Sequence, residues 1–154
     1  MTIEDDIAFL ERISIFRRLG APALRILAIG AEAYRVEPGQ VLFKAGETAD
    51  GAYIVQRGSF TLKPETRGGA EVVAGPATLL GESALLAETR RPATAVARED
   101  STVLRISRGM FLKMLEGYPD AAQRLREVIV ARADQWTRDM ENVRAALAVD
   151  TKPE

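Results

Sequence analysis

Hydrophobic and polar positions divide the chain into three zones with different periods. Up to about residue 33, apolar residues recur at near-helical spacing, at Ile3, Ile7, Leu10, Leu24, Leu27 and Ile29. Gly20 and Pro22 interrupt this pattern. The first zone, residues 1–33, is therefore predicted to hold two short helices joined by a turn.

The middle zone, residues 34–106, has the pattern of short strands. Apolar runs at 41–43, 53–55, 60–62, 72–73 and 103–104 are separated by turn residues that include Gly39, Gly46 and Gly58. Many short strands with regularly spaced turns are typical of a small antiparallel β-barrel or jelly roll. The chain is therefore expected to have an α+β fold, with this β-region flanked by helices.

The last zone, residues 107–148, is predicted to be helical. A short helix over 109–116 ends at Gly117 and Pro119, and a long helix over 120–148 contains no internal proline or glycine. Its apolar residues recur in heptad-like steps, at Ile129, Ala133, Trp136, Met140, Val143 and Leu147. Such a stripe indicates packing or dimerisation along the helix. Residues 149–154 are expected to form a disordered tail.

Composition removes most catalytic chemistry from consideration. The 154 residues include no cysteine and no histidine. Disulfides, thiolate nucleophiles, imidazole bases and nearly every zinc site are thereby excluded. No phosphate-binding loop of the Walker type is present either. We therefore expect a binding protein with no bound metal, and not an enzyme.

The charge balance is nearly neutral, with 21 basic and 22 acidic residues and a formal net charge of −1. DNA-binding domains usually carry a basic excess, so nucleic acid is not the expected partner. The first 16 residues carry Glu4, Asp5 and Asp6 and contain no unbroken apolar run. This segment is neither a secretion signal nor a membrane span, and a cytoplasmic protein without a membrane partner is expected.

The segment 79–86, Leu-Leu-Gly-Glu-Ser-Ala-Leu-Leu, carries the strongest functional pattern. A strand is predicted to end at Gly81, where a short helical turn begins, and free backbone N–H groups at such a start bind anions. Arg91 lies on the returning arm, where its guanidinium would clamp a phosphate with two hydrogen bonds. Glu82 would accept a hydrogen bond from a sugar hydroxyl. The pattern indicates a ligand with both a phosphate and a sugar.

At this point the chain resembles the cyclic nucleotide-binding domain family. The glycine-punctuated segments 38–47 and 53–58 follow the family's strand pattern, and segment 10–19 is similar to its N-terminal helical motif, with Ser14 where proline is common. The resemblance covers about residues 10–119. The long last helix falls where the family has its mobile C-terminal helix.

The resemblance implies a nucleotide site in the middle zone. Gly81 and Ala84 would present backbone amides to the cyclic phosphate, Glu82 would hold the ribose 2′-hydroxyl, and Arg91 would pair with the phosphate. The base would lie toward the last helix, which would close over it as a lid with Trp136 as a possible contact. The full set implied for the ligand is Gly81, Glu82, Ser83, Ala84, Arg91, Pro92 and Ala93.

The chain also departs from the family pattern. Pro92 has no N–H to donate to the phosphate and no hydroxyl of the kind that helps recognise guanine, so we expect cAMP rather than cGMP. Ala77 replaces a glycine that is usual before the phosphate site. Either Arg90 or Arg91 would point inward, and the spacing to Ala93 and Thr94 favours Arg91.

Several interpretations remain open. The first is a stand-alone cyclic nucleotide sensor that signals through movement or dimerisation of its last helix. The second is a degenerate module that binds no nucleotide and acts by dimerising or docking to a partner. In that case Glu82 would simply complement a helix dipole, and Trp136 would pack in the heptad stripe.

A transcription factor of the catabolite-activator type is the third interpretation. Such proteins continue from the long helix into a helix-turn-helix domain, whereas this sequence stops about there. We therefore expect no DNA binding in cis, unless the sequence is part of a longer gene product.

Overall fold

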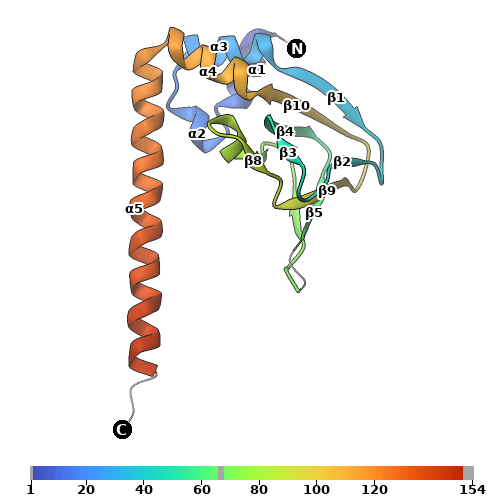
Figure 1. Ribbon diagram of the computed structural model, residues 1–154. Coiled ribbons are helices and arrows are strands. Elements are labelled where there is room, and N and C mark those ends of the chain that lie inside the picture. Colours follow the sequence, from blue (N-terminus) through green and yellow to red (C-terminus); the bar gives the residue numbers. More distant parts are fainter. Residues whose placement is uncertain (1, 66–67, 151–154) are drawn as a thin grey trace.

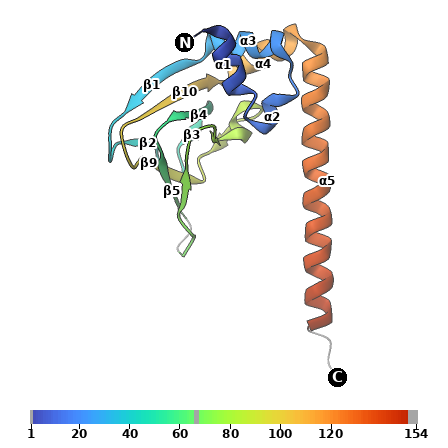
Figure 2. The ribbon, with the colours of Figure 1, turned by 180° about the vertical axis from the view of Figure 1, so that it is seen from behind.

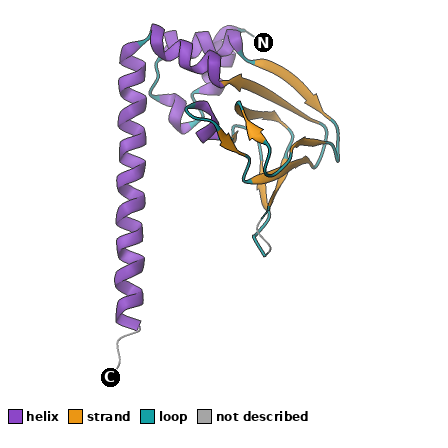
Figure 3. Ribbon diagram, viewed as in Figure 1, coloured by secondary structure: helices purple, strands orange, loops and turns teal. Residues whose placement is uncertain are grey.

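The computed structural model describes residues 2–65 and 68–150, without side-chain detail at 133–137 and 147–150. The short helices gather on one side of the antiparallel strands, which form the body of the molecule, and one long helix projects from the group of short helices (Figures 1 and 3). The α+β class expected from the sequence is confirmed. This arrangement places the segment around Gly81 between the strands and the long helix.

The first zone contains helices α1 (Ile3–Leu10), α2 (Ser14–Arg17) and α3 (Ala21–Gly30). The prediction of two helices was therefore wrong by one, because α2 lies between them. This single turn has little periodicity to detect, and both Ile15 and Phe16 are buried in the core. Tertiary packing, rather than a repeated pattern, accounts for the element.

The described strands form two four-stranded antiparallel sheets and one two-stranded ribbon. The first sheet contains, in spatial order, β1 (Glu32–Val36), β10 (Ser101–Ser107), β4 (Gly51–Arg57) and β7 (Leu79–Leu80). The second contains β2 (Val41–Phe43), β9 (Ala93–Ala97), β5 (Phe60–Pro64) and β6 (Val72–Ala74). The ribbon pairs β3 (Thr48–Ala49) with β8 (Thr89–Arg90). Since both four-stranded sheets keep free edges among the described strands, the fold is a jelly roll rather than a closed barrel.

Strand β4 separates two hydrophobic cores. Successive side chains of a strand point to opposite faces. Ala52 and Ile54 pack into the core shared with the helices, while Tyr53 and Val55 contribute to the core between the two sheets. The first sheet is thus covered by helices on one face and by the second sheet on the other.

The C-terminal zone consists of α4 (Arg108–Gly117) and α5 (Pro119–Asp150). Among the described side chains of α5, those buried against the helical core are Ala121 and Leu125 in its first turns. Arg124 fixes this end by donating from Nε to the Arg18 carbonyl at 2.5 Å and from Nη2 to the Leu19 carbonyl at 2.8 Å. The rest of α5 extends as a rod that stands apart from the sheets (Figures 1 and 2).

Helix α5 runs through Asp150 in the structure, so the disordered tail expected from residue 149 does not apply to residues 149 and 150. The remaining tail residues, 151–154, lie outside the described part of the chain. Strand β1 begins at Glu32, two residues before the expected start of the β-region. Helix α4 begins one residue after the expected boundary at 107, because Ser107 serves as its N-cap and accepts a hydrogen bond from the Met110 amide at 3.2 Å.

Candidate functional site

Gly81 connects strand β7 to a single 3₁₀ turn, η1 (Glu82–Leu85). Its backbone is left-handed, with φ 84° and ψ 39°, a conformation that glycine adopts without a Cβ penalty. A Cβ at this position would also collide with Nη1 of Arg91. The glycine is therefore required both by its own backbone and by the guanidinium beneath it.

Ala84 lies in the same turn and is fully buried. Its amide donates to the Gly81 carbonyl at 3.0 Å, as expected for the i→i+3 bonding of a 3₁₀ turn. The sequence analysis expected this amide to face an anion, and its role toward a phosphate stays a prediction. An anion would need to compete with the internal bond to reach the Ala84 amide.

Arg91 is held inside the protein although it is charged, with 5% of its surface exposed. Its backbone amide donates to the Glu47 carbonyl at 2.8 Å, and its carbonyl accepts from the Gly46 amide at 2.8 Å. Its Cζ lies 4.5 Å from the ring centre of Phe43 and 5.5 Å from that of Tyr53. Backbone bonds and two aromatic faces thus fix the guanidinium beneath Gly81.

The Arg91 guanidinium has no anionic partner among the described residues. Its Nη1 is buried without a hydrogen bond, and no described carboxylate forms an ion pair with it. Burial lowers the pKa of Arg91, while Tyr53, Asp50 and Glu47 act in the opposite direction. An arginine nevertheless keeps its charge in proteins. A buried, uncompensated cation of this kind favours binding of an anion.

The neighbours of Arg91 are placed differently. Arg90 is exposed, and its Nη1 donates to the Gly46 carbonyl at 2.9 Å. Of the two arginines, the structure therefore turns Arg91 inward. Pro92 is exposed, and Ala93 is partly buried at the start of β9. Both follow Arg91 directly in the chain, as the next two residues, and neither has a charged or hydroxyl group.

Ala77 has a positive φ of 67°, which is uncommon for a residue other than glycine. Its amide donates to the Val55 carbonyl at 2.7 Å, which fixes the turn before β7. This geometry explains why glycine suits the position. The turn forms with alanine as well, but the Cβ of Ala77 makes its left-handed backbone conformation unfavourable.

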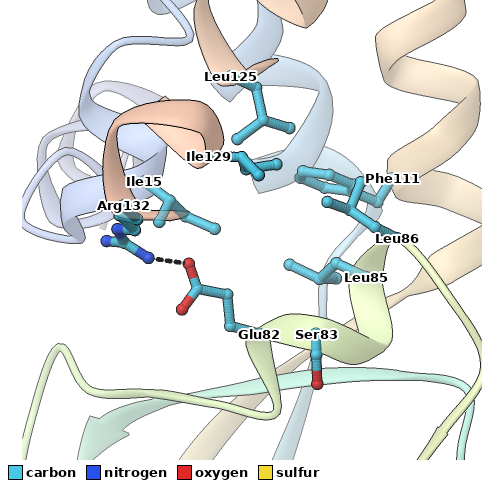
Figure 4. A pocket seen from close by; sticks show the side chains of 9 residues that line it. All are labelled: Ile15, Glu82, Ser83, Leu85, Leu86, Phe111, Leu125, Ile129 and Arg132. Atoms are coloured by element: carbon cyan, nitrogen blue, oxygen red, sulfur yellow. Dashed lines mark hydrogen bonds and ion pairs between the residues drawn. The ribbon is translucent and has the colours of Figure 1, made fainter. Parts of the chain in front are cut away.

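Glu82 and Ser83 are exposed on η1. The Glu82 carboxylate forms an ion pair with Nη1 of Arg132 from α5 (Figure 4). Nη2 of Arg132 donates to the Ser14 hydroxyl at 2.7 Å. Arg132 thus joins α5 to η1 and to α2. The sequence analysis missed it because it considered only the apolar stripe of the last helix. Its position three residues after Ile129, beside the apolar stripe, was the available signal.

Arg108 is a second residue that the sequence analysis missed. Its Nη1 donates to the carbonyls of Ala49, Ala84 and Ala87 at 3.1, 3.2 and 3.0 Å. The first residue of α4 therefore holds the C-terminal half of η1 and the loop after it against β3. A cation in the first turn of a helix opposes the helix dipole, and this unfavourable placement was the signal of another role.

Trp136 lies within α5, but its side chain is outside the described part of the structure. Its role as a base contact or packing residue stays a prediction. The described members of the predicted stripe, Ile129, Met140 and Val143, are 40%, 37% and 50% exposed. The structure thus leaves an apolar stripe of α5 uncovered at these residues.

Among the described residues, no group of acidic side chains is arranged to hold a metal ion. No described helix combines the length and the apolar character that crossing a membrane requires.

The structure thus combines a jelly roll, helices packed on one face of its first sheet, a left-handed glycine and a buried arginine beneath that glycine. The model of the cyclic nucleotide-binding domain family matches residues 34–118, more than half of the chain. The chain belongs to this family. The match includes the strands, the segment around Gly81 and helix α4.

Relatives agree with this assignment. A structure described as a cyclic nucleotide-binding-like protein from Brucella abortus is 41% identical, with a TM-score of 0.65, and the match covers 73% of this chain and 98% of that one. The N-terminal domain of a transcriptional regulator from Streptomyces coelicolor is 26% identical, with a TM-score of 0.79 and coverage of 86% and 94%. The cyclic AMP receptor protein of Thermus thermophilus is 33% identical, over 73% of this chain and 54% of that protein.

The chain spans only part of the curated relatives that it matches. It corresponds to 54% of the Thermus thermophilus protein and to 10% of a lysophospholipase from Yarrowia lipolytica, to which it is 27% identical. The similarity to the lysophospholipase therefore concerns a small part of that enzyme. The family and the structural relatives support a regulatory nucleotide-binding domain.

Proposed function

We propose that the chain is a cyclic nucleotide sensor that binds cAMP in preference to cGMP and signals through α5. The observation that carries the proposal is the buried Arg91 guanidinium, whose Nη1 has no partner among the described residues. A cyclic phosphate would supply the missing anion and accept charge-assisted hydrogen bonds. Such a sensor would work in the cytoplasm, where cyclic nucleotides are made and read.

The remaining residues of the proposed site supply the ribose contact and the shape of the pocket. Glu82 would accept a hydrogen bond from the ribose 2′-hydroxyl, and Ser83, Ala84, Pro92 and Ala93 would surround the phosphate. Glu82 is exposed and is already paired with Arg132 of α5. A ribose bound to Glu82 would therefore change a contact that α5 makes.

Signalling requires α5 to interact differently with the free and bound domain. A ligand shifts a two-state equilibrium only by its difference in affinity for the two states. Arg132 is the described residue that links α5 to the proposed ribose contact. We infer that rearrangement of this link, together with closure of α5 over the base, carries the signal.

The preference for cAMP rests on Pro92. Proline offers neither an N–H nor a hydroxyl, and the described neighbours Arg91 and Ala93 add no hydroxyl either. Guanine carries an exocyclic amine that a hydroxyl at this position would recognise. Pro92→Ser is therefore expected to raise cGMP affinity relative to cAMP affinity.

The test is a calorimetric titration with cAMP and, in parallel, with cGMP. We expect one saturable site per chain and stronger binding of cAMP. Glu82→Ala should weaken cAMP binding about tenfold through loss of a charge-assisted hydrogen bond, whereas Glu88→Ala, at an exposed residue beyond η1, should leave it unchanged. Absence of binding by both nucleotides at millimolar concentration would refute the sensor.

A degenerate module that dimerises or docks to a partner is the second candidate. It is favoured by the exposed stripe of Ile129, Met140 and Val143, and by the unusual residues Ala77 and Pro92 near the proposed site. Sedimentation with and without nucleotide separates the two candidates. A dimer that forms regardless of cAMP, in a protein that binds no nucleotide, would support the module.

A further inference from the structure

A cavity of about 290 Å³ lies where η1 meets α2, α4 and α5 (Figure 4). It is separate from the guanidinium of Arg91, which is not among the residues that line it, and it shares only Glu82 and Ser83 with the proposed nucleotide site. The two sites therefore meet along η1.

The cavity walls are apolar and come from four different elements. Leu86 and Ile129 are 42% and 40% exposed although both are large and apolar, whereas the other apolar walls are buried. The six apolar side chains are Ile15, Leu85, Leu86, Phe111, Leu125 and Ile129. Apolar surface of this kind, gathered in one hollow, is typical of a ligand site.

Charged groups lie at the rim of this apolar hollow. Arg132 pairs there with the carboxylate of Glu82, and the side chains of both residues are 45% exposed. Arg132 is also held by the Ser14 hydroxyl at 2.7 Å. Among the described residues, the Glu82 carboxylate has no second partner. Glu82 is therefore the group that can leave, while Arg132 stays at the rim.

We propose that this cavity binds a small amphipathic carboxylate, with its acid group on Arg132 in place of Glu82. Its apolar tail would lie among the six apolar side chains. The volume is about ten times the share of one water molecule, roughly 30 Å³. A tail of about eight carbon atoms, each similar in size to a water molecule, fits that space. The cation at the rim selects an acid over a neutral or positively charged head group.

The probe for this site is sodium octanoate, titrated calorimetrically into the whole chain. One saturable site is expected, with affinity rising about fourfold per methylene from butanoate to octanoate. Arg132→Gln should lower octanoate affinity about tenfold because the charge-assisted bond is lost. Arg126→Gln, on an exposed face of the same helix outside the cavity, should leave it unchanged. Circular dichroism establishes that both variants are folded.

The position of the tail is tested by nuclear Overhauser contacts between octanoate and the methyl groups of the protein. Contacts with Leu86 and Ile129 are expected. Contacts with the rings of Phe43 and Tyr53 instead would place the acid on Arg91 and overturn the proposal. No binding at millimolar octanoate, equal binding of octylammonium, or a cavity already filled by a second copy of α5 would overturn it as well.

This site does not require the proposed nucleotide function. A protein that binds octanoate but neither cyclic nucleotide would retain the cavity site and lose the nucleotide sensor. A protein that binds cAMP but not octanoate would do the reverse. The two failures are therefore distinguishable in the same set of titrations.

Discussion

Replacing Arg91 with methionine separates binding from folding, because the guanidinium is buried without an anion. Methionine retains an unbranched apolar stem that packs against the rings of Phe43 and Tyr53. The substitution removes the charge, the unpartnered Nη1 and two cation–π contacts. The nucleotide-free protein should therefore lose little stability, while nucleotide binding should fall sharply.

The magnitude follows from two opposing contributions. Removing an unsatisfied buried donor favours the variant by about 1–3 kcal/mol. Loss of the contacts with Phe43 and Tyr53, at 4.5 and 5.5 Å, costs about 0.5–2 kcal/mol each. The net change therefore lies between about 2 kcal/mol of stabilisation and about 3 kcal/mol of destabilisation, which for a chain of this length shifts Tm by at most roughly 12 °C.

Nucleotide binding should respond far more strongly to Arg91→Met. A phosphate left without its buried cation loses about 3 kcal/mol. That loss lowers the affinity for cAMP roughly a hundredfold. Arg90→Met is the matched control, because Arg90 is exposed and its guanidinium donates to a backbone carbonyl, that of Gly46.

Thermal melting and calorimetric titration of the two variants test this reasoning together. At 100 times the wild-type Kd, cAMP should stabilise the wild type and Arg90→Met by about 2.7 kcal/mol and Arg91→Met by about 0.4 kcal/mol. Unchanged cAMP affinity in Arg91→Met would remove the phosphate role. A variant that no longer folds would show instead that the guanidinium is a structural group.

Three further predictions concern other residues. Gly39→Ala should destabilise the protein by about 1–2 kcal/mol through left-handed strain alone, because a Cβ there meets no other atom. Gly81→Ala should cost more, because its Cβ would also collide with Arg91, and urea unfolding of both variants measures the difference. Met140→Glu should shift any α5-mediated dimer to monomer in sedimentation velocity, and an unchanged dimer would place the interface elsewhere. Hydrogen bonds from Arg35 lower the pKa of Asp100 in the folded protein. The stability that this ion pair contributes is therefore present above the unfolded pKa of about 3.9 and is lost as the pH falls below it. Asp100→Asn should lower the free energy of unfolding at pH 7, and the stabilities of variant and wild type should converge in acid.

The sequence predicted the elements that have a repeating hydrophobic pattern and missed the features that depend on a single tertiary contact. Strand runs and the long helix follow from periodicity, and the turn at Gly81 follows from its glycine. Helix α2 was missed because one turn has no period. Arg108 and Arg132 were missed because their partners lie 21 to 118 residues away in the chain. No local pattern identifies a partner at such separation.

One departure from the family pattern gains a physical reason in the structure. Position 14, commonly proline in the family that the segment 10–19 resembles, is serine here, and its hydroxyl accepts a hydrogen bond from Arg132. Proline has no such group, so this tie between α2 and α5 depends on the departure. The same guanidinium pairs with Glu82 on η1. A ribose bound to Glu82, or an acid bound in the cavity, would therefore alter the contacts of Arg132 and through them the link between α5 and α2. Arg132 is thus the described residue at which the two proposed ligands would compete or cooperate.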